Sequence, residues 1–213
     1  MEIAPHNSTG GIGHDLLTLL IANQGLQLLE SVGRDYLSSS AEAEKAAEVL
    51  LPVISAAIKK QTASKQDLID FLDKADDATL ERYLNAASTV DASSVVSEGE
   101  SVLSNILNIA GDRSGLIARI ASNSNLPAMA ISRLLPVVAT LAVGAITKSV
   151  TQEEKARIRQ SLNSPSGGRG FLSIFTSIFS RPSATHAGAL FLGKMIESGV
   201  SHEEPWVKQA FEQ

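Results

Sequence analysis

The chain has 213 residues, of which 44% are hydrophobic and 19% charged, proportions typical of a globular domain with a substantial core. It contains no cysteine, which excludes disulfides, thiol nucleophiles and thiolate metal sites. The net charge of −5 is unevenly divided: residues 1–100 carry 16 acidic and 7 basic side chains, whereas residues 101–213 carry 7 acidic and 11 basic. The basic excess of the second half is small and spread out, so it does not indicate a strong nucleic-acid patch.

Localisation is predicted from the N-terminus and from the apolar runs. The first residues, MEIAPHNSTGGIG, carry neither the basic stretch nor the apolar core of a secretory signal. The longest apolar run, residues 134–146, is shorter than the roughly 20 residues that span a bilayer, and it contains a proline. Together with the absence of cysteine, these features predict a soluble cytoplasmic protein without a transmembrane segment.

Apolar residues recur at helical spacing through the first hundred residues. Leucines between residues 16 and 32 predict two helices, or one helix interrupted at Gly25. Three further helices are expected, and each begins at side chains that can cap a helix N-terminus. These caps are Ser39 with Glu42, Ser64 with Asp67, and Asp76 or Asp77.

The second half has the same helical pattern, preceded by a segment rich in Ser, Gly and acid, residues 91–100, that is predicted to be a linker. An apolar stripe after it ends at Gly111, and a short helix is expected over residues 115–122. Pro127, whose fixed φ suits a first helical turn, opens a long apolar helix. The sequence NSPSGGRG, residues 163–170, predicts a flexible loop. Because no alternating strand pattern is found, the expected fold class is all-α.

The tetrapeptide Leu-Leu-Pro-Val occurs twice, at residues 50–53 and 134–137, inside strongly helical segments. A proline within a helix removes one backbone hydrogen bond and costs about 3 kcal/mol. Burial of two or three Leu or Val side chains, at about 1.5–3 kcal/mol each, outweighs that cost and predicts a kinked helix in the core. Two alternatives stay open. The carbonyls that lose their partners, those of Glu48 and Ser132, bind a ligand or ion, or a helix ends before each proline and a new one starts.

These elements predict a compact multi-helix bundle around two proline-kinked central helices. The repeated tetrapeptide also suggests two related helical units. The expected organisation is a flexible N-terminus over residues 1–12, a helical core over 13–163 with units at about 13–90 and 95–163, and a helical C-terminal extension over 164–213.

Two stretches of the core resemble a known bacterial family. They are LLTLLIANQGLQLLESVGRDYLSSSAEAEKAAEVLLPVISAAIKK and VLSNILNIAGDRSGLIARIASNSNLPAMAISRLLPVVATLAVGAITK. Over about residues 15–163, their order is similar to that of the YidB-type family of domains of unknown function. The resemblance implies a small helical bacterial protein and brings no activity or catalytic residue with it. Tyr36-Leu37-Ser38 and Asn125-Leu126-Pro127 depart from that family's pattern, which favours Gly-Leu-Ser at both places.

The residue patterns of common catalytic sites are not met. The sequence GALFLGKM, residues 188–195, nearly spells a phosphate-binding loop, but Met195 stands where a magnesium-binding hydroxyl is needed. The carboxylates of residues 67–77 alternate with apolar residues at helical spacing, which predicts a solvated helix face and no calcium loop. The four histidines, His6, His14, His186 and His202, lack the i, i+4 spacing of a helical zinc pair. We therefore expect no cofactor, no metal and no enzymatic activity.

Two surfaces are candidates for binding. The segment RGFLSIFTSIFSR, residues 169–181, places large apolar side chains on one side of a predicted helix, with Arg at each end. That side suits the chain's own core, which is the favoured reading, or a second copy, a partner's groove or a membrane interface. The other surface is a basic helix whose cations could contact phosphates. Glu153 and Glu154 lie beside these cations and weaken that interpretation. The candidate interaction residues are Phe171, Ile174, Phe175, Ile178 and Phe179, and the candidate basic contacts are Lys155, Arg157 and Arg159.

The sequence thus predicts a non-catalytic interaction or scaffold module that binds an unknown protein or a second copy through residues 170–181. The alternative is a nucleic-acid-binding regulator with a helix–turn–helix-like element around residues 115–138.

Overall fold

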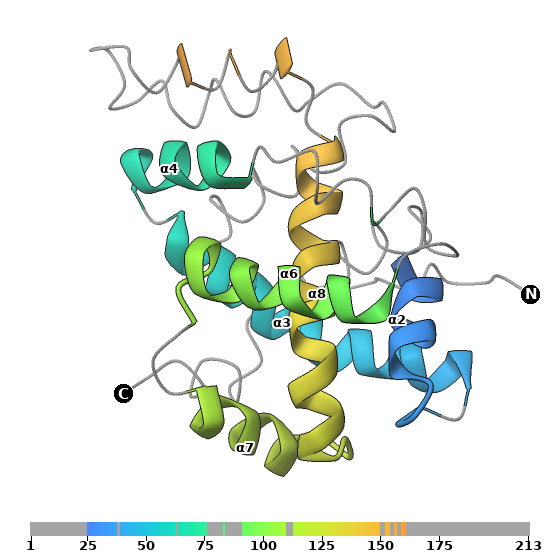
Figure 1. Cartoon of the computed structure of the whole chain (residues 1–213). Helices are drawn as coiled ribbons and strands as arrows, with labels where there is room; N and C mark the ends of the chain where they lie inside the picture. The colour runs from blue at the N-terminus through green and yellow to red at the C-terminus, as the bar shows by residue number, and fades with distance from the viewer. Residues whose placement is uncertain are drawn as a thin grey trace, which may run out of the picture.

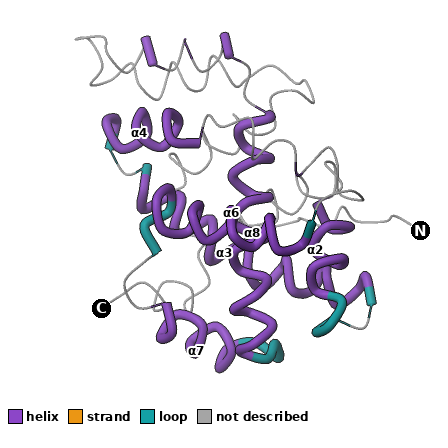
Figure 2. Tube along the Cα trace, in the orientation of Figure 1, coloured by secondary structure: helices purple, strands orange, loops and turns teal. Residues whose placement is uncertain are grey.

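The computed structural model describes residues 25–37, 39–62, 64–75, 83, 91–109, 113–149, 152, 153, 156, 159 and 160. Every regular element among these residues is helical, so the all-α prediction is confirmed for them (Figure 2). The elements are α2 (Gly25–Gly33), α3 (Ser40–Gln61), α4 (Lys65–Ala75), α6 (Ala92–Ser101), the π-helix η1 (Val102–Ile106), α7 (Arg113–Asn123) and α8 (Ala128–Ser149).

Helix α8 runs through the middle of the described structure and the other helices pack around it (Figure 1). Helix α6 crosses it on one side, α3 lies on the other, and α2 and α7 contact it as well. All residues of α8 from Leu134 to Thr147 are buried. By length and composition alone Ala128–Thr147 could cross a membrane, with a mean hydropathy of 1.9, but 83% of the apolar window is buried inside the fold. Such burial is typical of a core helix.

The two Leu-Leu-Pro segments lie in the core, as the sequence predicts. Leu50, Leu51, Leu134 and Leu135 are all fully buried. Helix α3 continues through Pro52, and α8 continues through Pro136. The alternative in which a helix ends before each proline is therefore wrong for both segments.

The expected linker at residues 91–100 is instead a helix, and that prediction was wrong. Asp91 caps α6 by accepting a hydrogen bond from the backbone N–H of Ser94 at 3.0 Å. Hydrogen bonds from Ser93 and Ser94 also lower the pKa of Asp91. Along α6, Val95 and Gly99 are buried. The serines that suggested a linker are exposed, and Ser93 and Ser94 donate hydrogen bonds to the capping Asp91, while the few buried residues attach the helix to the core.

Gly99 brings α6 into direct contact with the backbone of α8. A Cβ atom at position 99 would lie 2.2 Å from the carbonyl oxygen of Pro136 and 2.7 Å from its Cβ. Only a residue without a side chain allows this approach. Thr140, whose side chain is fully buried, donates a hydrogen bond to the same carbonyl at 3.1 Å, so the polar groups at the crossing are satisfied.

Local sequence signals set several helix boundaries. At the start of α4, Ser64 and Asp67 each accept a hydrogen bond from the other's backbone N–H, at 3.0 and 3.1 Å. Ser39 caps α3 by accepting a bond from the N–H of Glu42. The apolar stripe after α6 takes the wider π-helical winding, and Asn108, with a φ of 52°, leads the chain away from it. The predicted N-terminal segment, the caps at Asp76 or Asp77, the loop at 163–170 and the C-terminal extension lie outside the described residues.

Replacing Leu135 by Ala should destabilise the fold by about 2–5 kcal/mol, because a fully buried leucine leaves a cavity that the packed helices refill only in part. Met129 is on the same helix but 65% exposed, so Met129→Ala should change stability by no more than about 0.5 kcal/mol. Urea denaturation of both variants measures the difference. Equal effects would contradict the central position of α8.

Gly99→Ala should also destabilise the protein, by about 1–3 kcal/mol, through overpacking at the crossing. The same change in an exposed helix would stabilise it, since Ala is the better helix former by about 1 kcal/mol. Ser97→Ala, at an exposed position of α6, provides the matched control and should be neutral or slightly stabilising. A melting temperature for Gly99→Ala at or above that of the unsubstituted chain would show that α6 and α8 can separate without cost.

Candidate functional site

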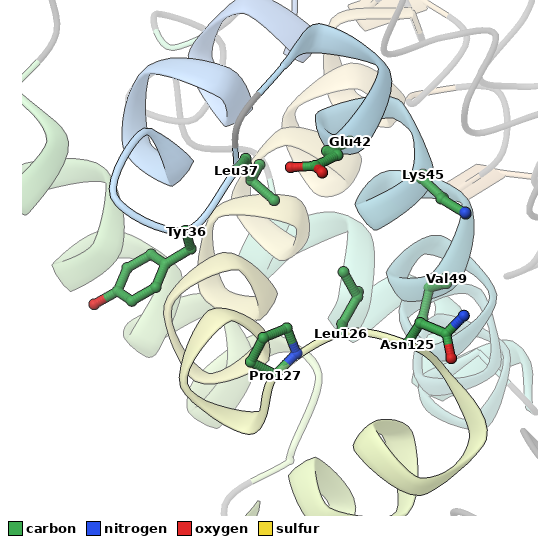
Figure 3. A pocket seen from close by; sticks show the side chains of 8 residues that line it. All are labelled: Tyr36, Leu37, Glu42, Lys45, Val49, Asn125, Leu126 and Pro127. Atoms are coloured by element: carbon green, nitrogen blue, oxygen red, sulfur yellow. The ribbon is translucent and has the colours of Figure 1, made fainter.

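A pocket of about 380 Å³ opens where the starts of α3 and α8 come together (Figure 3). Tyr36 and Leu37 come from the turn before α3, and Asn125, Leu126 and Pro127 come from the connection before α8. The remaining lining residues, Glu42, Lys45 and Val49, lie on the first turns of α3. Its volume is within the range of about 300–1,000 Å³ that is usual for binding sites.

The floor of the pocket is apolar and rests on the core. Leu37 is only 8% exposed, while Val49 and Leu126 are half-buried. Gly33 is the last residue of α2 and lies between Leu37 and Leu134. A Cβ atom at position 33 would be 2.5 Å from Leu37 Cδ1 and 3.2 Å from Leu134 Cδ2, so a side chain there would overlap Leu37. The backbone N–H groups of Tyr36 and Leu37 both donate to the Gly33 carbonyl, at 2.8 and 2.7 Å. The floor is therefore held against the Leu-Leu-Pro segment of α8.

Polar side chains stand around this floor. Glu42, Lys45 and Asn125 are exposed. Figure 3 shows Asn125 beside Val49, Glu42 turned toward Leu37, and the end of Lys45 pointing away from Leu126. The eight lining residues include one carboxylate and one ammonium group, but no serine, threonine, cysteine or histidine. Apolar lining residues with a few polar groups among them are the usual composition of a binding site.

The two segments that depart from the Gly-Leu-Ser pattern meet at this pocket. Tyr36-Leu37-Ser38 and Asn125-Leu126-Pro127 are almost ninety positions apart in the sequence, yet Tyr36, Leu37, Asn125, Leu126 and Pro127 line one cavity. The sequence marks both segments as helix entries before a Leu-Leu-Pro helix but gives no sign that they share a pocket.

The carbonyl that Pro136 deprives of its helical partner is occupied by an arginine. Arg113, the first residue of α7, donates from Nη2 to the backbone oxygen of Ser132 at 3.3 Å. The same guanidinium forms a two-pronged ion pair with Glu100 of α6, in which Nη2 and Oε1 are 2.7 Å apart. Burial lowers the pKa of Arg113, although an arginine stays charged at neutral pH. The freed Ser132 carbonyl therefore has a protein donor in Arg113 and needs no ligand to form a hydrogen bond.

Of the predicted basic contacts, Arg159 is described and lies at α4. It donates to Asp73 Oδ1 from Nε at 3.0 Å and from Nη2 at 2.6 Å. Lys155 and Arg157 lie outside the described residues. So do all five predicted interaction residues, Phe171, Ile174, Phe175, Ile178 and Phe179, together with the four histidines and residues 188–195.

The acidic residues of α4 that the structure describes face solvent, in line with the predicted solvated face. Asp67 caps the helix, and Asp70 accepts a hydrogen bond from Gln66 at 2.7 Å. A small cleft of about 90 Å³ lies between this face and Ile106 of η1. Within the described part of the chain, no three His, Asp or Glu side chains are grouped as metal ligands would be.

The candidate helix–turn–helix corresponds to α7, α8 and the four residues between them. In such motifs the second helix enters the DNA groove with exposed side chains. Here α8 is buried from Leu134 to Thr147, and its first six residues, of which Ala130 and Ile131 are also buried, include one cation, Arg133. On α7, Arg119 is half-buried and Arg113 binds Glu100.

These features define an all-helical domain with an apolar pocket at the starts of two core helices. Residues 18–149, more than half of the chain, match a family of bacterial proteins of unknown function, DUF937. The chain therefore belongs to that family, with which its resemblance to YidB-type proteins agrees. No curated protein and no solved structure matches the chain.

Arg113→Ala should destabilise the protein by about 1–3 kcal/mol, because the Ser132 carbonyl and the Glu100 carboxylate lose their shared partner. The ion pair alone contributes less, since the Glu100 side chain is 43% exposed and solvent screens it. Arg133→Ala removes an exposed arginine from α8 and should have little effect. The test is urea denaturation of both variants, with Glu100→Gln added to form a double-mutant cycle. Additive effects of Arg113→Ala and Glu100→Gln would show that the two side chains act independently.

Proposed function

We propose that this protein is a non-catalytic interaction module whose pocket binds an apolar segment of a partner protein. The observation that carries the proposal is the pocket at the starts of α3 and α8, with its floor of Leu37, Val49 and Leu126. These residues rest on a rigid core, so binding needs little reorganisation, which favours affinity. The exposed Glu42 and Lys45 give an entering segment polar partners at the rim and thereby fix its orientation.

A binding role fits this site better than catalysis does. Covalent catalysis needs a nucleophile beside a base, and the lining residues offer neither a hydroxyl nucleophile other than the tyrosine nor an imidazole. Glu42 and Lys45 are exposed to water, which weakens their electrostatic action on a bound group. We also propose that the protein is soluble, because its most apolar helix is enclosed by its own fold, and that it acts in the cytoplasm, with which its lack of cysteine is consistent.

The nucleic-acid-binding alternative has a weaker structural basis. Only the first turns of helix α8 have exposed side chains that could enter a DNA groove. Arg159 is paired with Asp73. Retention of the chain on duplex DNA with a strong salt dependence would favour this alternative over the pocket.

The pocket is tested by photo-crosslinking in bacteria, using the full chain. A photo-reactive phenylalanine analogue at Lys45, on the rim, should attach to a discrete partner protein. The same analogue at Lys60 should not, although Lys60 is also an exposed lysine of α3 and lies about 22 Å further along the helix.

A second variant shows whether the attachment depends on the pocket. Val49→Asp places a carboxylate against the apolar floor and should abolish the product formed at position 45. A melting curve must show that this variant stays folded, since Val49 is half-buried. Identical products from positions 45 and 60, or a product that survives Val49→Asp, would overturn the proposed function.

A further inference from the structure

On its α2–α3 side, the surface beside the pocket is acidic. Across residues 27–49, which form the end of α2, the turn and the start of α3, five exposed side chains are acidic and two, Arg34 and Lys45, are basic. An acidic surface around an apolar pocket is complementary to an apolar segment that carries basic residues at its ends. The acidic side chains are Glu30, Asp35, Glu42, Glu44 and Glu48.

The chain itself contains a segment of this chemistry. In RGFLSIFTSIFSR, residues 169–181, three phenylalanines and two isoleucines recur at helical spacing between Arg169 and Arg181. No acidic residue occurs in this stretch. Its apolar side matches the floor formed by Leu37, Val49 and Leu126, and its two arginines are opposite in charge to the acidic side chains of residues 27–49.

The length of chain after Gln160 allows this segment to reach the pocket. Arg159 lies at α4, where it binds Asp73. The pocket adjoins the opposite end of α8, a helix of 22 residues and thus about 33 Å long. The nine residues from Gln160 to Arg169 can extend over about 31 Å, and six helical residues from there to Phe175 add about 9 Å, so that the reach of about 40 Å exceeds the length of α8. Such a link also holds the segment at an effective concentration of the order of millimolar, which favours docking within one chain over docking between chains.

From these observations we infer that residues 169–181 dock in the pocket of their own chain. The apolar side of the segment, which includes Phe175, then faces Val49 and Leu126. The docked segment occupies the place that the proposed function gives to a partner, so it acts as an internal competitor. This regulatory consequence rests on the proposed function. The docking itself does not, because it requires only the pocket and the segment.

Because the chain contains no cysteine, a thiol-specific crosslinker reacts only with cysteines that are introduced on purpose. Cysteines are introduced in pairs into the full chain, and a short bismaleimide joins thiols that come close. Lys45→Cys with Thr176→Cys places one thiol on the rim and one beside Phe175, while it leaves every apolar side chain in place. Lys60→Cys with Thr176→Cys is the control on the same helix.

We expect the pair at 45 and 176 to form an intramolecular crosslink, at monomer mass, at least about tenfold faster than the control pair. Adding Phe175→Asp, which puts a carboxylate among acidic neighbours, should reduce the rate to that of the control, and Val49→Asp should do the same. Equal rates for the two pairs would overturn the inference. So would a product at dimer mass, which would assign the segment to the pocket of a second copy.

The two proposals fail separately. A partner captured at position 45, without a crosslink between 45 and 176, supports the proposed function and overturns the internal docking. A crosslink between 45 and 176, without a captured partner, supports the docking and contradicts the proposed function. If both hold, Phe175→Asp should increase partner capture at position 45 several-fold, because it removes the competitor.

Discussion

The crossing of α6 over α8 at Gly99 and Pro136 is the contact on which the rest of the described structure depends. Helix α8 is buried through every residue from Leu134 to Thr147, and a helix that is apolar all round must be covered by neighbours on every side. Helix α6 provides one of these covers at very short range, since a Cβ at position 99 would overlap the Pro136 carbonyl. A larger residue there would separate the two helices and open the core around α8.

The same crossing explains how the proline in α8 is tolerated. Glu100 follows Gly99, so the residue that brings α6 close is next to the carboxylate that holds Arg113. Arg113 in turn donates to the Ser132 carbonyl, which is the group that Pro136 leaves without its helical donor. One guanidinium thus ties α6, α7 and α8 together at the proline. Because Arg113 already bonds to the Ser132 carbonyl, we assign this region a structural role. The candidate binding site is the pocket at the starts of α3 and α8.

The sequence predicts those parts of the fold that depend on neighbouring residues or on a strong apolar pattern. Burial of Leu134 and Leu135 follows from helical spacing, and the start of α4 follows from the reciprocal cap of Ser64 and Asp67. Helix α6 was missed because its attachment depends on one glycine and on contacts with α8, which are over thirty positions away. The π-helical winding of residues 102–106 was missed as well, since their apolar spacing fits an α-helix equally well.

The pocket was missed for a related reason: it exists only where two distant helix entries meet. Its walls are residues of the turns and first helical positions, most of them exposed or half-buried, while the residues that hold the helices together are buried elsewhere. Leu37, which lies next to Gly33, is the one buried lining residue, and Tyr36, Val49 and Leu126 pack against the core from the pocket side. The exposed side chains at Lys45 and Asn125 can therefore change with little effect on the core. A rigid core with a separately variable rim lets one helical framework hold binding surfaces of different specificity, which is the property that an interaction module requires.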